Sequence, residues 1–306
     1  MTRRPVRNVA ASVRDRLTAR ARLRREDVQL VFLRYAIERL LYRLSVSNHH
    51  YRFILKGAML FAQWAPTPHR PSGDLDLLGL GDSTPDVVRD IFREVVAIPV
   101  EDDGVLFLPD TVVAEIARPD AEYSGVSVDV SAEINGAKLK VHIDIGYGDA
   151  ITPAAVQIEY PSLLDQPRAK LLAYPRETVV AEKFQAMVEL GMANTRLKDF
   201  FDLWAIANTF EFDGETLAEA LARTFDRRDT ALPTSDPLAF TPAFAERKQR
   251  EWTAFLDRTD IAMASKSLPE TQALIATFVL PPVLARARNE PFVRRWAPDD
   301  GWMETR

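Results

Sequence analysis

The sequence contains no cysteine, which excludes disulfide bonds, thiolate metal sites and cysteine nucleophiles and is compatible with a reducing compartment. No apolar run approaches the roughly 18 residues that a membrane-spanning helix needs. The basic N-terminus lacks the apolar core of a secretory signal. We therefore expect a cytoplasmic protein with no membrane partner.

An excess of positive charge is also missing. The net charge is -5 and the pI about 5.6, which argues against a wholly basic nucleic-acid coat but leaves room for a local basic surface. With 306 residues, 47% hydrophobic and 27% charged, the chain reads as soluble and globular, with one large or two modest domains.

Positive charge is concentrated at the N-terminal end. Within residues 1–27, nine arginines face only three acidic residues. The simplest interpretation is a solvated helix face, and the functional interpretation is contact with the phosphates of nucleic acid. The nine are Arg3, Arg4, Arg7, Arg14, Arg16, Arg20, Arg22, Arg24 and Arg25.

Two carboxylates stand two residues apart in the run Ser72–Leu78. If this run is a strand, Asp74 and Asp76 share one face, while Leu75 and Leu77 point to the other. Neighbouring carboxylates repel each other, and neither can be buried unpaired at low cost. A divalent cation removes both problems, and hard oxygen ligands of this kind suit Mg²⁺.

A third carboxylate lies on the second strand of a predicted hairpin. Asn135-Gly136 separates two runs of alternating apolar residues, which is the strongest short-range hairpin signal. The alternation places Asp144, together with His142, on the face opposite to Ile143.

A tight turn precedes the carboxylate pair. Lys56 and Gly57 follow a short apolar run, Phe53–Leu55, and the backbone N–H groups of such a turn can bind an anion. A glycine turn, Asp-x-Asp and a lone Asp on a later strand, in this order, resemble the DNA polymerase β-like nucleotidyltransferase superfamily. The resemblance implies that three carboxylates hold two metal ions and that the turn cradles nucleotide phosphates.

Three prolines, Pro153, Pro161 and Pro167, mark a linker-like stretch that suggests a domain boundary. We predict an α+β fold: a polymerase β-like nucleotidyltransferase domain over 1–167, with a mixed or antiparallel sheet flanked by helices, and an α-helical domain over 168–306. The expected helices are Asp27–Leu44, Thr84–Ala97, Glu177–Leu190, Leu197–Asn208, Gly214–Thr224, Pro242–Arg258 and Leu268–Ala287. The expected strands outside the hairpin are Phe53–Leu55, Leu75–Leu80, Val105–Leu108 and Thr111–Ala117.

A second set of chemical residues falls in two of these helices. Lys183 is set in an apolar helix, where the simplest interpretation is an ordinary surface lysine. Lys198 and Asp202 are spaced i, i+4, as in an intrahelical ion pair worth a few tenths of a kcal/mol. Arg196 and Asp199 complete this set.

The amino-acid sequence and the order of five short motifs resemble the AbiEii/AbiGii (MenT-like) nucleotidyltransferase toxin family. The resemblance extends over roughly residues 10 to 215. The matching blocks are Lys56-Gly57, Arg70-Pro71-Ser72-x-Asp74-x-Asp76, Asp144-Ile145-Gly146-x-Gly148-Asp149, Ala181-Glu182-Lys183 and Arg196-x-Lys198-Asp199-x-x-Asp202. The resemblance implies transfer of a nucleotide from an NTP to RNA. It also implies two bound metal ions, either Mg²⁺ or Mn²⁺. The implied acceptor is the 3′ end of tRNA, and the implied partner is a cognate antitoxin, often of the AbiEi type.

The same resemblance implies residue roles. Asp74, Asp76 and Asp144 would bind the metal ions, and Asp144 would also help to deprotonate the acceptor hydroxyl. The groups implied near the nucleotide phosphates are Lys56, Gly57, Ser72, Lys183, Arg196 and Lys198. Lys183 is also implied as a catalytic residue that neutralises phosphate charge. Asp199 and Asp202 are implied to position these groups or their helix. Ala58 departs from the pattern, because many nucleotidyltransferases have Ser or Gly at this position of the turn.

Two other functions remain open at this stage. The same chemistry would serve a nucleotidyltransferase with a small-molecule or protein acceptor. A non-catalytic module that binds RNA or a partner protein would keep the fold without the reaction. Phosphorylation of Ser72, which shares the face of Asp74, would place negative charge beside the metal site and inactivate an enzyme.

Overall fold

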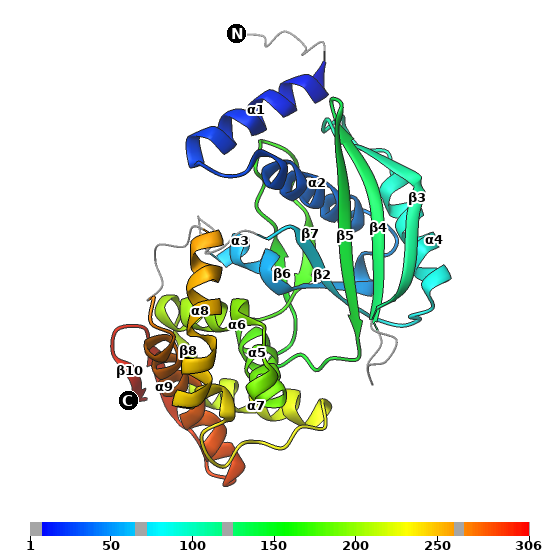
Figure 1. Ribbon diagram of the computed structural model, residues 1–306. Helices are drawn as coiled ribbons and strands as arrows, with labels where there is room; N and C mark the ends of the chain where they lie inside the picture. The colour runs from blue at the N-terminus through cyan, green and yellow to red at the C-terminus, as the bar shows by residue number, and fades with distance from the viewer. Residues whose placement is uncertain (1–7, 65–71, 118–124, 260–265, 306) are drawn as a thin grey trace. The chain divides into compact units, whose positions relative to one another are not determined.

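The computed structural model describes residues 8–64, 72–117, 125–259 and 266–305 (Figure 1). The chain divides into two compact units. Unit 1 comprises Met1–Gly148 and Val156–Ala173, and unit 2 comprises Asp149–Ala155 and Tyr174–Arg306. The candidate residues fall on both units, so each unit is described by itself.

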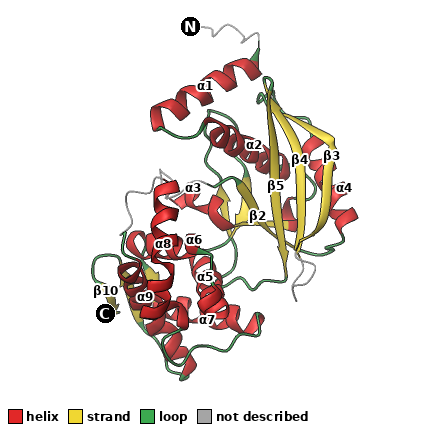
Figure 2. Ribbon diagram, in the orientation of Figure 1, coloured by secondary structure: helices red, strands yellow, loops and turns green. Residues whose placement is uncertain are grey.

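Unit 1 is built on a mixed seven-stranded sheet in the order β3-β4-β5-β2-β1-β7-β6, whose β2–β5 arrows are clear in Figure 2. The pairs β2–β5 and β1–β7 are parallel, and the other neighbours are antiparallel. Strand β2 therefore occupies the middle of the sheet. The strands are β1 (Phe53–Lys56), β2 (Asp74–Gly79), β3 (Leu106–Ala117), β4 (Gly125–Ile134), β5 (Ala137–Tyr147), β6 (Val156–Glu159) and β7 (Lys170–Ala173).

Helices α2 and α4 contact the sheet at β5 and β3, and α1 packs on α2. The phenyl rings of Phe53 on β1 and Phe92 on α4 lie 5.3 Å apart, in a core made by the apolar side chains of the central strands. Helix α2 begins where the sequence predicts, because the Asp27 side chain accepts a hydrogen bond from the Leu30 N–H. The helices of unit 1 are α1 (Val9–Arg24), α2 (Val28–Ser45), α3 (Leu60–Trp64) and α4 (Pro85–Ala97).

The predicted hairpin is confirmed. Asn135 and Gly136 both have positive φ, 45° and 82°, which is the geometry of a two-residue type I′ turn. Ile134 and Ala137 are the first paired residues, and the ladder continues along both strands. The two separate strands expected over residues 105–117 are instead one strand, β3, interrupted by a register shift between Leu108 and Val113.

Unit 2 consists of five helices and a small three-stranded sheet, β10-β9-β8, among the residues that the structure describes. The helices match the predicted ranges to within three residues at either end. They are α5 (Arg176–Leu190), α6 (Leu197–Thr209), α7 (Gly214–Arg227), α8 (Pro242–Thr259) and α9 (Leu268–Ala287), and the strands are β8 (Phe212–Asp213), β9 (Arg294–Ala297) and β10 (Gly301–Glu304).

The expectation of an all-helical region after residue 167 missed four short strands. Strand β7 pairs with β1 and β6 in the large sheet. Strands β8, β9 and β10 pair with one another in the small sheet. Trp296 on β9 is buried, and its indole N–H donates to the Ala207 carbonyl at 2.8 Å. These strands have two to four residues, too few for alternation to be visible in the sequence.

Helix α9 is long and apolar enough, by length and composition, to cross a membrane, the one such helix in the described part of the chain. Half of its apolar stretch is buried inside the protein. Phe278 in this helix packs against Phe212 and Trp296, with ring centres 5.0 and 4.9 Å away. Such contacts are those of a core helix.

Candidate active site

Strand β2 presents two carboxylates on one face of the sheet. Leu75 and Leu77 are fully buried, whereas Asp76 is half-buried and Asp74 is exposed. This alternation places the leucines toward the core and both carboxylates on the opposite face.

The third predicted carboxylate lies on the neighbouring strand. In the parallel pairing of β2 with β5, Asp76 is opposite Asp144 and Asp74 is opposite His142. Residues that are partners in a parallel ladder point to the same side, and neighbouring strands are about 4.8 Å apart. Asp74, Asp76 and Asp144 are therefore gathered on one face, with 51% of the Asp144 side chain exposed.

The turn after β1 closes the same site. Lys56 is the partner of Asp76 in the antiparallel pairing of β1 with β2. Gly57 follows with φ +73°, and a Cβ there would overlap Asp76 Oδ2 and lie 2.5 Å from Asp76 Cγ. Glycine is required at this position for both its backbone conformation and its lack of a side chain. Ser72, two residues before Asp74, is half-buried, whereas Arg70 and Pro71 lie outside the described residues.

A histidine bridges carboxylates on this face. His142 Nδ1 lies 2.8 Å from Asp129 Oδ1, and its Nε2 lies 3.3 Å from Asp144 Oδ1. Burial opposes the imidazolium, but the hydrogen bond to Asp129 and the charges of Asp144, Asp129 and Asp74 outweigh it, so the pKa of His142 is raised. Asp129 also pairs with Lys140 at 2.9 Å.

Sequence reasoning placed His142 on the correct face but gave it and Asp129 no role. The signal was available in the hairpin. A two-residue turn at Asn135-Gly136 fixes the register, and counting outward from it pairs Asp129 with His142 and Ser127 with Asp144.

The donor set on this face suits a hard divalent cation. All three acidic side chains offer carboxylate oxygens, as Mg²⁺ prefers, and Mg²⁺ commonly takes one or two protein carboxylates and completes its shell with water and substrate phosphate. Within the described residues, no three acidic or histidine side chains are close enough to enclose one ion by themselves. The facing pair Asp76 and Asp144, with Asp74 beside them, fits such a shared coordination.

The second predicted set lies in unit 2 and forms a buried ionic cluster. Lys183 Nζ on α5 lies 2.6 Å from Asp199 Oδ1 and 2.8 Å from Asp202 Oδ2, both on α6. The Lys183 side chain is 11% exposed, and those of Asp199 and Asp202 are 1% and 0% exposed. Lys183 is therefore a buried interhelical cation, and its interpretation as an ordinary surface lysine is wrong.

The two other cations of this set differ from Lys183. Arg196 Nε donates to Asp199 Oδ2 at 2.6 Å, and its side chain is 41% exposed. Lys198 is exposed and makes no ion pair with a described residue. The i, i+4 ion pair expected between Lys198 and Asp202 is therefore not formed, because Asp202 points into the helix interface toward Lys183.

Arg228 joins two further motif positions and had no signal in the sequence. Its Nη2 lies 3.0 Å from Asp149 Oδ1 and 3.4 Å from Glu182 Oε1, while Nη1 donates to Gln185 at 2.9 Å. Burial opposes its charge, but Glu182 and Asp149 outweigh burial and raise the pKa of Arg228. Arg228 thus links Asp149 and Glu182, which belong to two different sequence motifs of the family resemblance.

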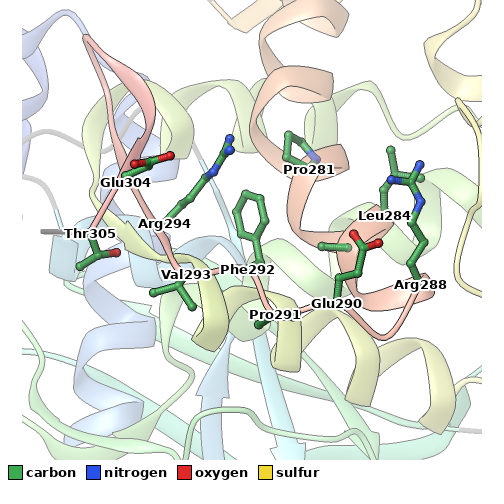
Figure 3. A pocket seen from close by; sticks show the side chains of 11 residues that line it. Pro281, Leu284, Arg288, Glu290, Pro291, Phe292, Val293, Arg294, Glu304 and Thr305 are labelled. Carbon is green, nitrogen blue, oxygen red and sulfur yellow. The ribbon is translucent and has the colours of Figure 1, made fainter.

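A pocket of about 690 Å³ also lies in unit 2, at the end of α9 and beside β9 and β10 (Figure 3). Phe292, Arg288, Arg294 and Glu304 are among its lining side chains. None of the residues predicted for catalysis or phosphate binding lines it.

The comparison with protein families agrees with the nucleotidyltransferase chemistry. The family model "Nucleotidyl transferase AbiEii toxin, Type IV TA system" matches residues 39–276. A search among curated proteins finds no significant match.

Solved structures give a weaker likeness. A nucleotidyltransferase candidate from H. pylori is 16% identical, with a TM-score of 0.46 over 84% of this chain and 95% of that one. JHP933 from Helicobacter pylori is also 16% identical, with a TM-score of 0.47 over 83% of this chain and 91% of that one.

The family match shows that the protein is a nucleotidyltransferase. The chain belongs to the AbiEii nucleotidyltransferase toxin family, since the family model covers most of its length. It is thus an enzyme of a toxin–antitoxin system, with an NTP as substrate and an antitoxin as its partner.

Proposed function

We propose that this protein transfers a nucleoside monophosphate from an NTP to RNA in a Mg²⁺-dependent reaction, with the 3′ end of tRNA as acceptor. Modification of that end would stop translation, which suits a toxin acting in the cytoplasm. The observation that supports the proposal most is the register of β2 and β5, which sets Asp76 opposite Asp144 and brings Asp74 to the same face. The choice of RNA as the acceptor is supported by the family resemblance.

Asp74, Asp76 and Asp144 would hold the metal ions of this site. Two ions held there would stabilise both the attacking and the leaving oxygens of an in-line phosphoryl displacement. Asp144 is the more exposed of the facing pair and would accept the proton of the acceptor hydroxyl. His142 would keep the Asp144 carboxylate oriented, because it is itself fixed by Asp129.

The turn at Gly57 would receive the triphosphate. The Asp76 carboxylate lies against it without an intervening side chain, so a phosphate bound by the turn would also face the metal ligands. Lys56 and Ser72 would contact the same phosphates from the two sides of this turn. The helix that follows has only five residues, so backbone N–H groups of the turn, rather than a helix dipole, would supply the attraction.

The contacts of unit 2 favour different roles for its cations. Lys183 is neutralised by two buried carboxylates, so we assign it the role of holding α5 to α6 rather than a direct phosphate contact. Arg196 and Lys198 are more exposed and remain able to reach a phosphate. Asp199 would orient Arg196 through their 2.6 Å hydrogen bond.

A labelling assay tests the proposal. Purified protein is incubated with total tRNA, Mg²⁺ and each of the four labelled NTPs in turn, beside an Asp74→Ala/Asp76→Ala control. Label that appears on tRNA and is lost in the control is the expected result, and it also identifies the nucleotide. Label on another molecule would keep the reaction and overturn the acceptor. Absence of label from every acceptor, with Mg²⁺ or Mn²⁺, would overturn the proposed function.

A further inference from the structure

Helix α1 presents a row of arginines along one side. Arg16, Arg20 and Arg24 are four residues apart, and each step of four rises about 6 Å along the helix. The buried row Val13, Leu17 and Ala21 packs next to them. The arginines therefore stand at the border between helix core and solvent, in a regular line.

Helix α2 adds a fourth arginine to this row. The charges of Arg20 and Arg24 act on Arg34, whose pKa is lowered first by burial and then by Arg20. Arg34 pairs with Glu26, yet its Nε is buried and has no hydrogen-bond partner among the described residues. We name Arg16, Arg20, Arg24 and Arg34 the arginine stripe.

The contacts that hold the three α1 arginines of the stripe within the protein are weak, whereas Arg34 is held by its ion pair with Glu26. Arg16 pairs with the fully exposed Asp165 at 3.4 Å, a distance and exposure at which an ion pair contributes little. Arg20 reaches the Leu163 carbonyl only at 3.5 Å. Arg24 makes no ion pair with any residue in the described ranges.

Few negative charges oppose the arginine stripe. Glu26 and Asp165 are its ion-pair partners, and the charge of the buried Glu38 also acts on Arg20. Glu38 is itself paired with Arg39 at 2.6 Å. Residues 1–27 as a whole carry +6, while the other 279 residues carry -11. A polyanion approaching this acidic protein would therefore be attracted at one place.

The arginine stripe adjoins the carboxylate strand. Leu30 and Leu33 of α2 lie against the residue before Asp74: a Cβ on Gly73 would be 3.0 Å from Leu33 Cδ2 and 3.4 Å from Leu30 Cδ1. Arg34 is one helical turn beyond Leu30 and faces the same side of α2. Arg34 therefore lies on the side of α2 that approaches the start of β2.

We propose that the arginine stripe binds the phosphate backbone of the acceptor RNA and directs the strand toward Asp74. A regular row of guanidinium groups suits a ligand whose charges repeat regularly, and each group can bind a phosphate through two N–H donors. The contacts are to phosphate, so they supply affinity without reading sequence. This inference rests on the proposed function for the identity of the RNA as an acceptor.

Helix α1 supplies its own control. Arg22 is exposed, carries the same charge and projects about 160° away from Arg20 and Arg24 at 100° per residue. Glutamine has nearly the helix propensity of arginine, so Arg→Gln changes charge with little effect on the helix. The test compares Arg24→Gln and Arg20→Gln/Arg24→Gln with Arg22→Gln, all in the Asp74→Ala/Asp76→Ala background without NTP, so that binding is measured apart from catalysis.

The affinity for labelled total tRNA is measured from 50 to 300 mM salt. We expect each stripe arginine to weaken binding on the order of 3- to 5-fold near 0.15 M salt, and to lower the slope of log K against log salt by about 0.7 to 0.9. Arg22→Gln should change neither. Equal effects of Arg22→Gln and Arg24→Gln, or an unchanged slope in the double variant, would overturn the inference.

These outcomes separate the two proposals. A protein that labels no RNA, but whose tRNA binding depends on Arg20 and Arg24, would refute the proposed reaction and keep the binding surface. A protein that labels tRNA, but binds it equally well in all variants, would keep the reaction and remove the arginine stripe from it. Melting temperatures of the variants, measured beside binding, exclude loss of folding as the cause.

Discussion

Asp76 on β2 and Asp144 on β5 are direct partners in a parallel ladder, although 68 residues separate them in the chain. The sheet achieves this because the β4–β5 hairpin returns β5 alongside β2. Their carboxylates would otherwise repel each other at this spacing, so the arrangement is one that a bound cation stabilises.

The first prediction concerns this pair. Asp76→Asn and Asp144→Asn should each lower the rate of nucleotidyl transfer about a hundredfold or more, because each removes a charged ligand worth several kcal/mol in the transition state. Glu115→Gln is the matched control, since Glu115 is exposed on the same face of the sheet, opposite Ser127. Initial rates with labelled NTP measure the effect. Retention of activity in either Asp variant, or an equal loss in Glu115→Gln, would contradict the assignment.

The second prediction concerns the turn at Gly57. Gly57→Ala should lower both stability and activity, because it adds strain at φ +73° and pushes a methyl group into the Asp76 carboxylate. Gly81→Ala isolates the strain, since Gly81 has φ +90° and the nearest atom to a new Cβ is a flexible Arg52 nitrogen at 3.7 Å.

Urea unfolding and transfer rates are measured for both glycine variants. We expect Gly81→Ala to lose about 1 kcal/mol of stability and to remain active, whereas Gly57→Ala should lose more stability and most of its activity. Similar activities in the two variants would show that the approach of Asp76 to the turn is unimportant for the reaction.

The third prediction concerns the buried cluster of unit 2. Lys183→Met should lower the free energy of unfolding by about 3–5 kcal/mol, because it removes the buried ammonium that pairs with both Asp199 and Asp202. Lys183→Met/Asp202→Asn should recover part of that loss. Lys198→Met, on the exposed side of α6, should change stability by less than about 0.5 kcal/mol. The midpoints of denaturant unfolding of these variants measure the effect. A Lys183→Met variant as stable as the native protein would point to a direct role of Lys183 in substrate binding instead.

The fourth prediction concerns pH. Burial raises the pKa of Glu38, against the opposing effects of Arg39, the Leu163 N–H and the Ser162 hydroxyl. The folded protein therefore keeps this proton to higher pH than the unfolded chain, whose glutamates titrate near 4.3. The contribution of Glu38 to stability is then complete below about pH 4.3 and is lost as the pH rises through the folded-state pKa.

Glu38→Gln removes this dependence. The difference in unfolding free energy between the native protein and Glu38→Gln should fall as the pH rises from about 4 and then become constant, as followed by urea unfolding from pH 4 to 8. Glu115→Gln removes the same charge from an exposed position and serves as the comparison. A difference that grows with pH would show that the ion pair with Arg39 dominates over burial.

Local signals in the sequence predicted much of the carboxylate site. Alternation placed Asp74 and Asp76 on one face, and the Asn135-Gly136 turn fixed which face of its strand carries Asp144. These features depend on side-chain periodicity and turn chemistry, which are properties of neighbouring residues. The hairpin register even contains the contact between Asp129 and His142, which sequence reasoning did not use.

The buried cluster could not be predicted in this way. Lys183, Asp199 and Asp202 look in sequence like surface residues of two amphipathic helices, and only the packing of α5 on α6 brings them together. Arg228 is a similar case, because its partners Asp149 and Glu182 are 79 and 46 residues away. Long-range ion pairs leave no periodic trace in the chain.

The sequence by itself therefore determined the helices, the longer strands and the faces that Asp74, Asp76 and Asp144 occupy, because each of these follows from residues within a few positions of one another. Tertiary structure alone decided that β2 and β5 are neighbours and parallel, that Lys183 is enclosed by two carboxylates, and that Arg34 joins the arginines of α1. Those relationships arise when separate elements are packed to bury their apolar faces, and that packing sets which distant charges meet.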